Sequence, residues 1–384
     1  MTAAADDPIQ RFSPGEALSR GAFLACSWTW CIGMWLPVYL ISDFGGWGWL
    51  AFAVPNVIGA MAVGFVHRTP AAATACRARS MATLRWFSVV TIAFHLGFLG
   101  WTCWEQCPPY VPRAAAFGVP LLAVAVGLAL SAFGSRAWGA LAVLVLPVAP
   151  AVMVAAMWTT NFWALDIPPA AGTVTDPVAL PMYATGLAFG FLLCPHLDLS
   201  ILRVREEAPG ATGDTAFVLG FGVMFLMLIA LTAFYAAGFL GGWFSYYLLV
   251  HFFVQGTFTV GAHLRELREH GWPRLLRPGW PVGAVLIAAA MVALAPVSEL
   301  AVTVLNKPPT RVAYESVLWF YALPLPAAGL FMLLRKPLRR AFWVSTGAAT
   351  PLMAAGALWG VWWAIPAAVG VPVAAAVLAR RQGS

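Results

Sequence analysis

The chain has 384 residues, of which 61% are hydrophobic and only 10% are charged, and its mean hydropathy is +0.81. A soluble domain carries a charge on about a quarter of its residues, so this composition excludes a soluble globular protein. The apolar residues form runs of about 20, long enough to cross the ~30 Å hydrocarbon layer as helices. They lack the period-two alternation of a membrane β-barrel. The sequence therefore predicts an all-α integral membrane protein.

The apolar runs predict about twelve transmembrane helices. In chain order we place them at 17–41, 47–66, 86–104, 114–133, 138–158, 178–201, 216–240, 244–263, 282–297, 312–334, 341–357 and 360–379. Residues 1–16 are polar and lack the basic flank and cleavage site of a signal peptide, so we expect a cytoplasmic N-terminal segment. Residues 17–384 are expected to form a single polytopic membrane domain.

The basic residues set the expected orientation. With the N-terminus in the cytoplasm, nineteen of the 22 Lys and Arg residues fall in cytoplasmic segments, and only Arg113, Lys307 and Arg311 lie outside. This asymmetry follows the positive-inside rule. It predicts an even number of helices in a cell (inner) membrane, with both termini cytoplasmic. The net charge of +7 follows from this topology, so the expected partner is the lipid bilayer and no nucleic acid.

A polar stripe marks the eighth predicted helix. Tyr247, His251, Gln255, Thr259 and His263 recur every fourth position, and steps of four drift by only about 40° around a helix. Polar groups at membrane depth are costly and usually face a cavity or a partner helix. The stripe therefore predicts the lining of a substrate path; the alternative is that these side chains hold neighbouring helices together.

Other predicted helices carry isolated polar groups near mid-membrane. Asn56 follows Pro55, whose missing N–H leaves a carbonyl free, and His95 lies in the third helix. Asp198 is an acidic residue that we place inside a span, beside Pro195. It is a candidate for binding a cation or a proton. The simpler alternatives are a locked kink at Asn56, an interhelical contact at His95, and an interfacial ion pair of Asp198 with Arg203 or Arg205.

The first predicted helix combines aromatic and small polar groups. Trp28 and Trp30 lie in mid-helix together with Ser27, although tryptophan usually favours the membrane interface. Aromatic walls with a few polar groups suit an organic ligand. Packing within the helix bundle is the alternative.

Two predicted helices carry matching interruptions. Gly33 and Pro37 lie late in the first helix, and Gly190 and Pro195 lie late in the sixth. Interrupted helices at corresponding positions of two halves are typical of inverted-repeat transporters. We therefore predict helix breaks at these four residues and repeats at 17–158 and 178–334, followed by two extra helices at 341–379.

These features resemble the LeuT-type fold of the amino acid–polyamine–organocation superfamily. The stretch Ser27-Trp28-Thr29-Trp30, followed by Gly33, resembles the first core helix of sodium/solute symporters, and Pro195 to Ser200 with Arg203 is similar to a motif of nucleobase–cation symporters. The resemblance implies substrate contacts from helices 1 and 6 and a sodium site between helices 1 and 8. It implies that Trp30, His95 and Gln255 lie on the substrate side, with Thr257 and Thr259 nearest a sodium ion.

The cysteines permit one disulfide, and the sequence lacks the common motifs of enzymes and ATPases. Cys103 and Cys107 lie at the outer end of the third helix, where an oxidising exterior permits a disulfide. We expect no metal site. The sequence contains no P-loop, Gly-x-Ser-x-Gly or His-Glu-x-x-His motif, so no catalytic residue is assigned and transport driven by ATP is not expected.

The sequence thus predicts a secondary transporter, a symporter of a small organic solute driven by a sodium or proton gradient, with no other cofactor. The expected solute contacts are Trp28, Trp30, Asn56, His95, His251 and Gln255, and the expected ion-coupling residues are Ser27, Asp198, Thr257 and Thr259. One alternative is a membrane-embedded enzyme for a lipid-linked or acyl substrate, with His95, His196 or His251 as general base. The other is a non-catalytic sensor or assembly subunit.

Overall fold

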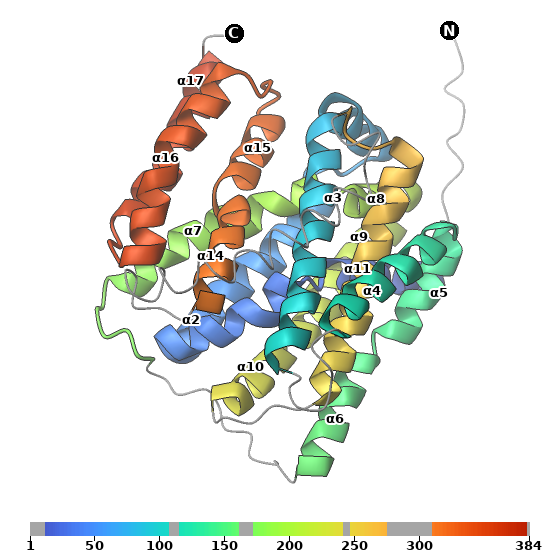
Figure 1. Ribbon diagram of the computed structural model, residues 1–384. Helices are drawn as coiled ribbons and strands as arrows, with labels where there is room; N and C mark the ends of the chain where they lie inside the picture. The colour runs from blue at the N-terminus through green and yellow to red at the C-terminus, as the bar shows by residue number, and fades with distance from the viewer. Residues whose placement is uncertain (1–11, 107–114, 161–171, 241–245, 275–308, 382–384) are drawn as a thin grey trace, which may run out of the picture.

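A computed structural model describes residues 12–106, 115–160, 172–240, 246–274 and 309–381, and every regular element in these ranges is a helix (Figure 1). Eight helical segments there are long and apolar enough to cross a membrane. The predicted all-helical membrane protein is confirmed at this level. The number twelve stays a prediction, and the predicted helix at 282–297 lies outside the described residues.

Up to residue 160, the described ranges contain six helices. They are α1 (Pro14–Trp28), α2 (Cys31–Val66), α3 (Pro70–Gln106), α4 (Ala115–Ser131), α5 (Ser135–Val145) and α6 (Val148–Thr160). Gly45 in α2 has φ +64, so two helices meet there at a kink. This kink separates the predicted spans 17–41 and 47–66.

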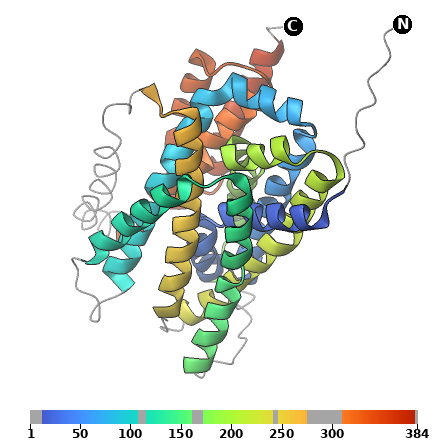
Figure 2. The same ribbon diagram turned by 90° about the vertical axis from the view of Figure 1, so that its right-hand side faces the viewer.

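The second half begins with α7 (Ala179–Leu193), the short 3-10 helix η1 (Cys194–Leu197) and α8 (Leu199–Glu207). It continues with α9 (Gly210–Leu219), the π-helical turn η2 (Gly220–Phe225), α10 (Leu226–Leu240) and α11 (Tyr246–His270). The last elements are α14 (Pro309–Ala322), α15 (Pro324–Leu333), α16 (Arg340–Trp359) and α17 (Ala364–Arg381). Helices α16 and α17 lie side by side at one edge of the bundle, and Figure 2 shows α11 running along its length.

The first predicted helix is interrupted at Thr29 and Trp30, between α1 and α2. Two side chains bond the free carbonyls that a helix end leaves: the Thr29 hydroxyl donates to Ala25 O (2.8 Å) and Trp30 Nε1 donates to Ser27 O (2.8 Å). The prediction of a break at Gly33 and Pro37 is wrong, because both lie inside α2.

The helix continues through Pro37, and tyrosine hydroxyls of α14 and α10 bond backbone carbonyls in the turns before the proline. The Tyr314 hydroxyl donates to Cys31 O and Ile32 O (3.4 and 3.5 Å). The Tyr235 hydroxyl donates to Met34 O. Bonds of this kind let membrane helices tolerate proline.

The second interruption lies at residues 194–198, between α7 and α8. Pro195 is in η1, as predicted, and the Asp198 side chain caps α8 by accepting a hydrogen bond from Ser200 N (2.7 Å). Gly190 lies inside α7 instead, so its assignment as a break is wrong. Its place is explained by close packing, since a Cβ there would lie 2.6 Å from Tyr321 O.

Helix α1 crosses the segment α9–η2 at very short range. A Cβ on Gly21 would lie 3.2 Å from Gly220 N, and one on Gly220 would lie 2.7 Å from Gly21 O. Small residues at a crossing let two backbones approach closely in membrane proteins. The two segments therefore pack backbone to backbone.

Candidate functional site

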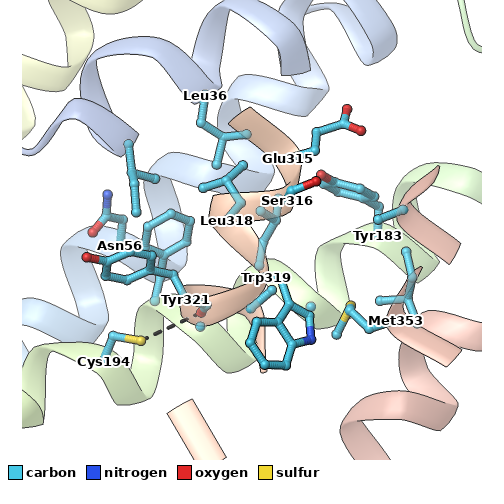
Figure 3. A pocket seen from close by; sticks show the side chains of 18 of the residues that line it. Leu36, Asn56, Tyr183, Cys194, Glu315, Ser316, Leu318, Trp319, Tyr321 and Met353 are labelled. Carbon is cyan, nitrogen blue, oxygen red and sulfur yellow. Dashed lines mark hydrogen bonds between the residues drawn. The ribbon is translucent and has the colours of Figure 1, made fainter. Parts of the chain in front are cut away.

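A cavity of about 380 Å³ lies beside the first interruption, between α2, α7, α14 and α16 (Figure 3). Its lining is mostly apolar and rich in aromatic side chains: Trp28, Trp30, Tyr183, Phe191, Trp319 and Tyr321. Asn56 and Cys194 lie on one side of it and Glu315 on another. Of the predicted solute contacts, Trp28, Trp30 and Asn56 line this cavity.

The two tryptophans and Asn56 form one contact group. The Trp28 and Trp30 rings lie 4.2 Å apart between centroids, and Trp28 Nε1 donates a hydrogen bond to Asn56 Oδ1 (2.8 Å). Trp30 also contacts Tyr321 and His263, at centroid distances of 5.5 and 5.9 Å. Trp30 thus lies between the cavity and the polar face of α11.

His95 does not line the cavity; it fixes the start of α2. Its Nδ1 lies 2.8 Å from Thr91 O, and its Nε2 accepts a hydrogen bond from Cys31 N (3.3 Å). A neutral imidazole satisfies both contacts, with Nδ1–H as donor. The Tyr321 hydroxyl donates to Thr91 Oγ1 (3.1 Å), so one turn of α3 supports both the interruption and the cavity wall.

The polar stripe of α11 faces the core for most of its length. His251, Gln255, Thr259 and His263 are buried, whereas Tyr247 is exposed. Thr259 Oγ1 lies 3.5 Å from Cys26 O and 3.4 Å from Ser27 O. Among the described residues, neither amide atom of Gln255 makes a hydrogen bond. His251 and Gln255 are not part of the cavity lining.

Two predicted ion-coupling residues behave differently from Thr259. The Ser27 hydroxyl donates within its own helix, to Leu24 O (3.2 Å), so only its backbone carbonyl faces α11. Thr257 is buried, and its hydroxyl makes no hydrogen bond to any described residue. Two positions apart on a helix, Thr257 and Thr259 point about 200° apart, so both cannot face the same carbonyls.

Asp198 is fully buried in the second interruption. Its Oδ1 accepts hydrogen bonds from Ser200 N and Ser200 Oγ, both at 2.7 Å. Its Oδ2 lies 3.8 Å from His263 Nε2 and accepts no hydrogen bond from the part of the chain that the structure describes. Sequence reasoning included His263 in the stripe but missed it as the partner of Asp198.

The alternative ion pairs of Asp198 are not formed. Arg203 binds Glu266 with two hydrogen bonds (2.6 and 2.8 Å) and also pairs with Glu269 (2.7 Å). Arg205 pairs with Asp214 (2.8 Å). Both guanidinium groups therefore serve other carboxylates.

We call the ion pairs around α8 the α8 cluster; they join this helix to α1, α3 and α11. The pairs are Arg203 with Glu266 and Glu269, Arg20 with Glu207, and Arg77 with Glu206. Burial alone would raise the pKa of Glu266, but hydrogen bonds from His270 and Arg203, with the charge of Arg203, lower it to about 2. Glu266 is thus held as a carboxylate.

A smaller group of ion pairs, the Asp43 cluster, lies beside the cavity. Arg311 of α14 donates to both carboxylate oxygens of Asp43 in α2 and to Glu315 Oε1 (2.7 Å). Its guanidinium also lies 4.9 Å above the Tyr39 ring. Because Glu315 lines the cavity, this cluster borders the candidate site.

Two buried histidines meet at the end of α2. His196 Nδ1 in η1 lies 3.3 Å from His67 Nε2. Burial, with a smaller contribution from the charge of Arg79, lowers the pKa of His67 to about 4. His67 is therefore neutral at physiological pH.

The remaining predictions fall partly outside the described residues. The predicted Cys103–Cys107 disulfide cannot be placed, since Cys107 is not among them. Within the described ranges, no three His, Cys, Asp or Glu residues gather into a group that could hold a metal ion.

The chain was compared with protein families, curated proteins and solved structures. No protein-family model and no curated protein matches it. A solved structure titled "Inward facing conformation of Mhp1" is similar, with 12% sequence identity and a TM-score of 0.47, over 97% of this chain and 91% of that chain. A likeness of this degree leaves the function to be judged from the site itself.

Proposed function

We propose that this protein is a secondary transporter that moves a small organic solute with the help of an ion gradient. The observation that carries the proposal is the pair of helix interruptions, at residues 29–30 and 194–198, both buried and both in contact with one aromatic cavity. Irregular backbone at membrane depth is tolerated where it is buried in protein or lines a cavity. Interrupted helices form the substrate and ion sites of many transporters.

The cavity defines the kind of solute. Its volume of about 380 Å³ suits a small molecule. Its aromatic walls favour a molecule with a flat or apolar body, because ring faces pack well against one another. Asn56 is the polar group that would orient the solute, since Trp28 holds its amide oxygen in place. Trp30 and Tyr321 would form the wall nearest the interruption.

Two positions could bind the coupling ion. The carbonyl oxygens of Cys26 and Ser27 at the end of α1, with Thr259 Oγ1, form a group of oxygen ligands of the kind that binds sodium at interrupted helices. The second position is the Asp198 carboxylate. The carbonyls fit sodium only partly, because Cys26 O also accepts a hydrogen bond from Thr29 N and Ser27 O accepts one from Trp30 Nε1.

Transport would proceed by alternating access. The α8 cluster and the Asp43 cluster would close opposite ends of the path, with the basic end in the cytoplasm as the charge pattern predicts. We propose that residues 17–158 and 178–334 are inverted repeats, and the two interruptions, one in each range, support this.

The structure offers less support for an enzyme. Both ring nitrogens of His95 contact backbone groups, and His196 contacts His67. His251 Nδ1 makes no hydrogen bond to a described residue, but His251 is buried and does not line the cavity. A general base needs a free nitrogen within reach of the proton that it removes.

The test is a solute screen on the purified full-length protein. Thermal stabilisation by amino acids, nucleobases, sugars and vitamins would identify ligands, and uptake into proteoliposomes under sodium or proton gradients would follow. For a solute so found, Asn56→Leu should weaken binding about tenfold, because the solute loses one hydrogen bond in a buried site. Thr346→Val, which removes a buried hydroxyl outside the cavity lining, is the control. The absence of both stabilisation and uptake across the panel would contradict the proposal.

A further inference from the structure

The pair formed by Asp198 and His263 joins the two sides of the candidate path. Asp198 lies at the start of α8, four residues after the cavity-lining Cys194, and His263 lies on α11. Both side chains are fully buried. Asp198 Oδ2 and His263 Nε2 face each other at 3.8 Å, and neither atom makes a hydrogen bond to a described residue.

The other atoms of the two side chains are already bound. Ser200 donates twice to Asp198 Oδ1, and His263 Nδ1 lies 3.1 Å from Ser88 Oγ. These contacts hold the carboxylate and the imidazole so that Asp198 Oδ2 and His263 Nε2 point toward each other. With the Nδ1–H of His263 donating to Ser88 Oγ, Nε2 is an acceptor, and a single proton placed between it and Asp198 Oδ2 would complete a hydrogen bond.

The charge of Asp198 has no cation to balance it in the described surroundings. The nearby arginines, Arg203 and Arg205, bind Glu266, Glu269 and Asp214. The other titratable groups around the pair are Glu266 on α11, Tyr321 on α14 and His95 on α3. None of these supplies a positive charge, and a buried charge without a partner is strongly unfavourable.

The chemistry of the facing atom distinguishes a proton from sodium. Sodium is a hard cation that prefers oxygen ligands, whereas the atom that faces Asp198 Oδ2 is an imidazole nitrogen. A proton binds well between a carboxylate oxygen and an imidazole nitrogen.

We infer that the coupling ion of this transporter is a proton, bound between the Asp198 carboxyl group and the His263 imidazole. This inference rests on the proposed transport function and adds the identity of the ion. When the proton is bound, one atom of the pair donates to the other and holds α8 against α11. In the tautomer whose Nδ1–H donates to Ser88 Oγ, loss of the proton leaves two acceptor atoms facing each other, and this link between the helices is lost.

The position of the pair explains how proton binding would reach the solute. η1 joins Asp198 directly to Cys194, whose thiol contacts Tyr321 O (3.6 Å) at the cavity wall. A displacement of α8 from α11 would move this part of the wall. Proton release and a change in the cavity are therefore mechanically linked through four residues of one segment.

Infrared difference spectroscopy tests proton binding without a known solute. In wild-type protein in liposomes, lowering the pH should produce the carbonyl absorption of a protonated, buried carboxyl group. Asp198→Asn should abolish this absorption, His263→Gln should shift the pH at which it appears, and Ser200→Ala should shift its frequency. Glu206→Gln, which alters another carboxyl group on α8, should leave it intact. An absorption that persists in Asp198→Asn, or a wild type that shows none, would overturn the inference.

A flux experiment separates this inference from the proposed function. With a solute from the screen, Asp198→Asn should lose uptake driven by a pH gradient while it retains exchange of solute across the membrane. If uptake instead requires sodium and survives in Asp198→Asn, the protein is a transporter and the proton assignment is wrong. If no solute moves although the infrared signal belongs to Asp198, the proton site stands and the transport function fails.

Discussion

The two ion clusters hold the ends of the bundle in different ways. In the α8 cluster, one short helix is tied to α1, α3 and α11 by pairs that include the buried Glu266. In the Asp43 cluster, Arg311 makes one link between helices, to Asp43, and its other partner Glu315 lies on its own helix. Among the ion pairs of the described residues, several must break to separate the helices at the α8 end, whereas in the Asp43 cluster the pair of Arg311 with Asp43 must break. The described conformation is therefore held more firmly at the α8 end.

The largest effect is expected for Arg203→Met in the α8 cluster. This change leaves Glu266, with 1% of its side chain exposed, without its main partner, and breaking a buried pair costs about 3–5 kcal/mol. Thermal unfolding in detergent should show a marked fall in Tm. The control is Arg340→Met at an exposed position. Equal Tm values for the two variants would show that the α8 cluster contributes no extra stability.

A second effect at the α8 end should depend on pH through His67. The unfolded side chain binds a proton below pH ~6.5, whereas the folded one does so only below about 4. Since the unfolded state binds more protons between these values, stability should fall as the pH drops from 6.5 to 4, by up to about 3 kcal/mol. His67→Gln should flatten this part of the Tm curve and change it little at pH 8. If Tm of His67→Gln fell between pH 6.5 and 4 as steeply as Tm of the wild type, His67 would not be the source of the pH dependence.

At the cavity end, Arg311→Gln should have the smaller effect on stability, about 2 kcal/mol, the scale of a hydrogen bond to a charged group. Its clearer consequence should be access to the cavity. The Cys194 thiol lines the cavity and is buried, so its reaction with a maleimide, followed by peptide mapping, should become about tenfold faster. Arg340→Gln serves as the control. An unchanged rate at Cys194 would mean that Arg311 does not guard the cavity.

The fold was predictable where it depends on hydrophobic length. The apolar runs located most described helices, because crossing a bilayer requires about 20 apolar residues. The position of the first interruption was not predictable from proline alone. Pro37 lies inside α2, where Tyr235 and Tyr314, far away in the sequence, bond carbonyls of the preceding turns. Thr29 and Trp30 instead end α1 with local side-chain bonds.

The candidate site was predictable in part. Trp28, Trp30 and Asn56, which the sequence predicts as solute contacts, line the cavity; they stood out because tryptophan and amide groups at mid-membrane are unusual. Trp319 and Tyr321 were missed, since they lie in a segment that looks like ordinary apolar packing; Pro324, three residues after Tyr321, was the available signal of a break. The partner of Asp198 was missed because Arg203 is closer in sequence than His263, and only the fold shows that Arg203 is occupied.

The crossing of α1 with α9 and η2 limits which parts of the protein can move independently. Gly21 and Gly220 bring the two helix backbones so close that a methyl group on either glycine would crowd the backbone of the other helix. Because no side chains lie between the two backbones there, no change of rotamer can accommodate a sliding of one helix along the other. Helix α1 and the segment α9–η2 should thus move together as one rigid body. Spin labels on these two elements would report a constant distance between them, while the distance from α1 to α11 changes during transport.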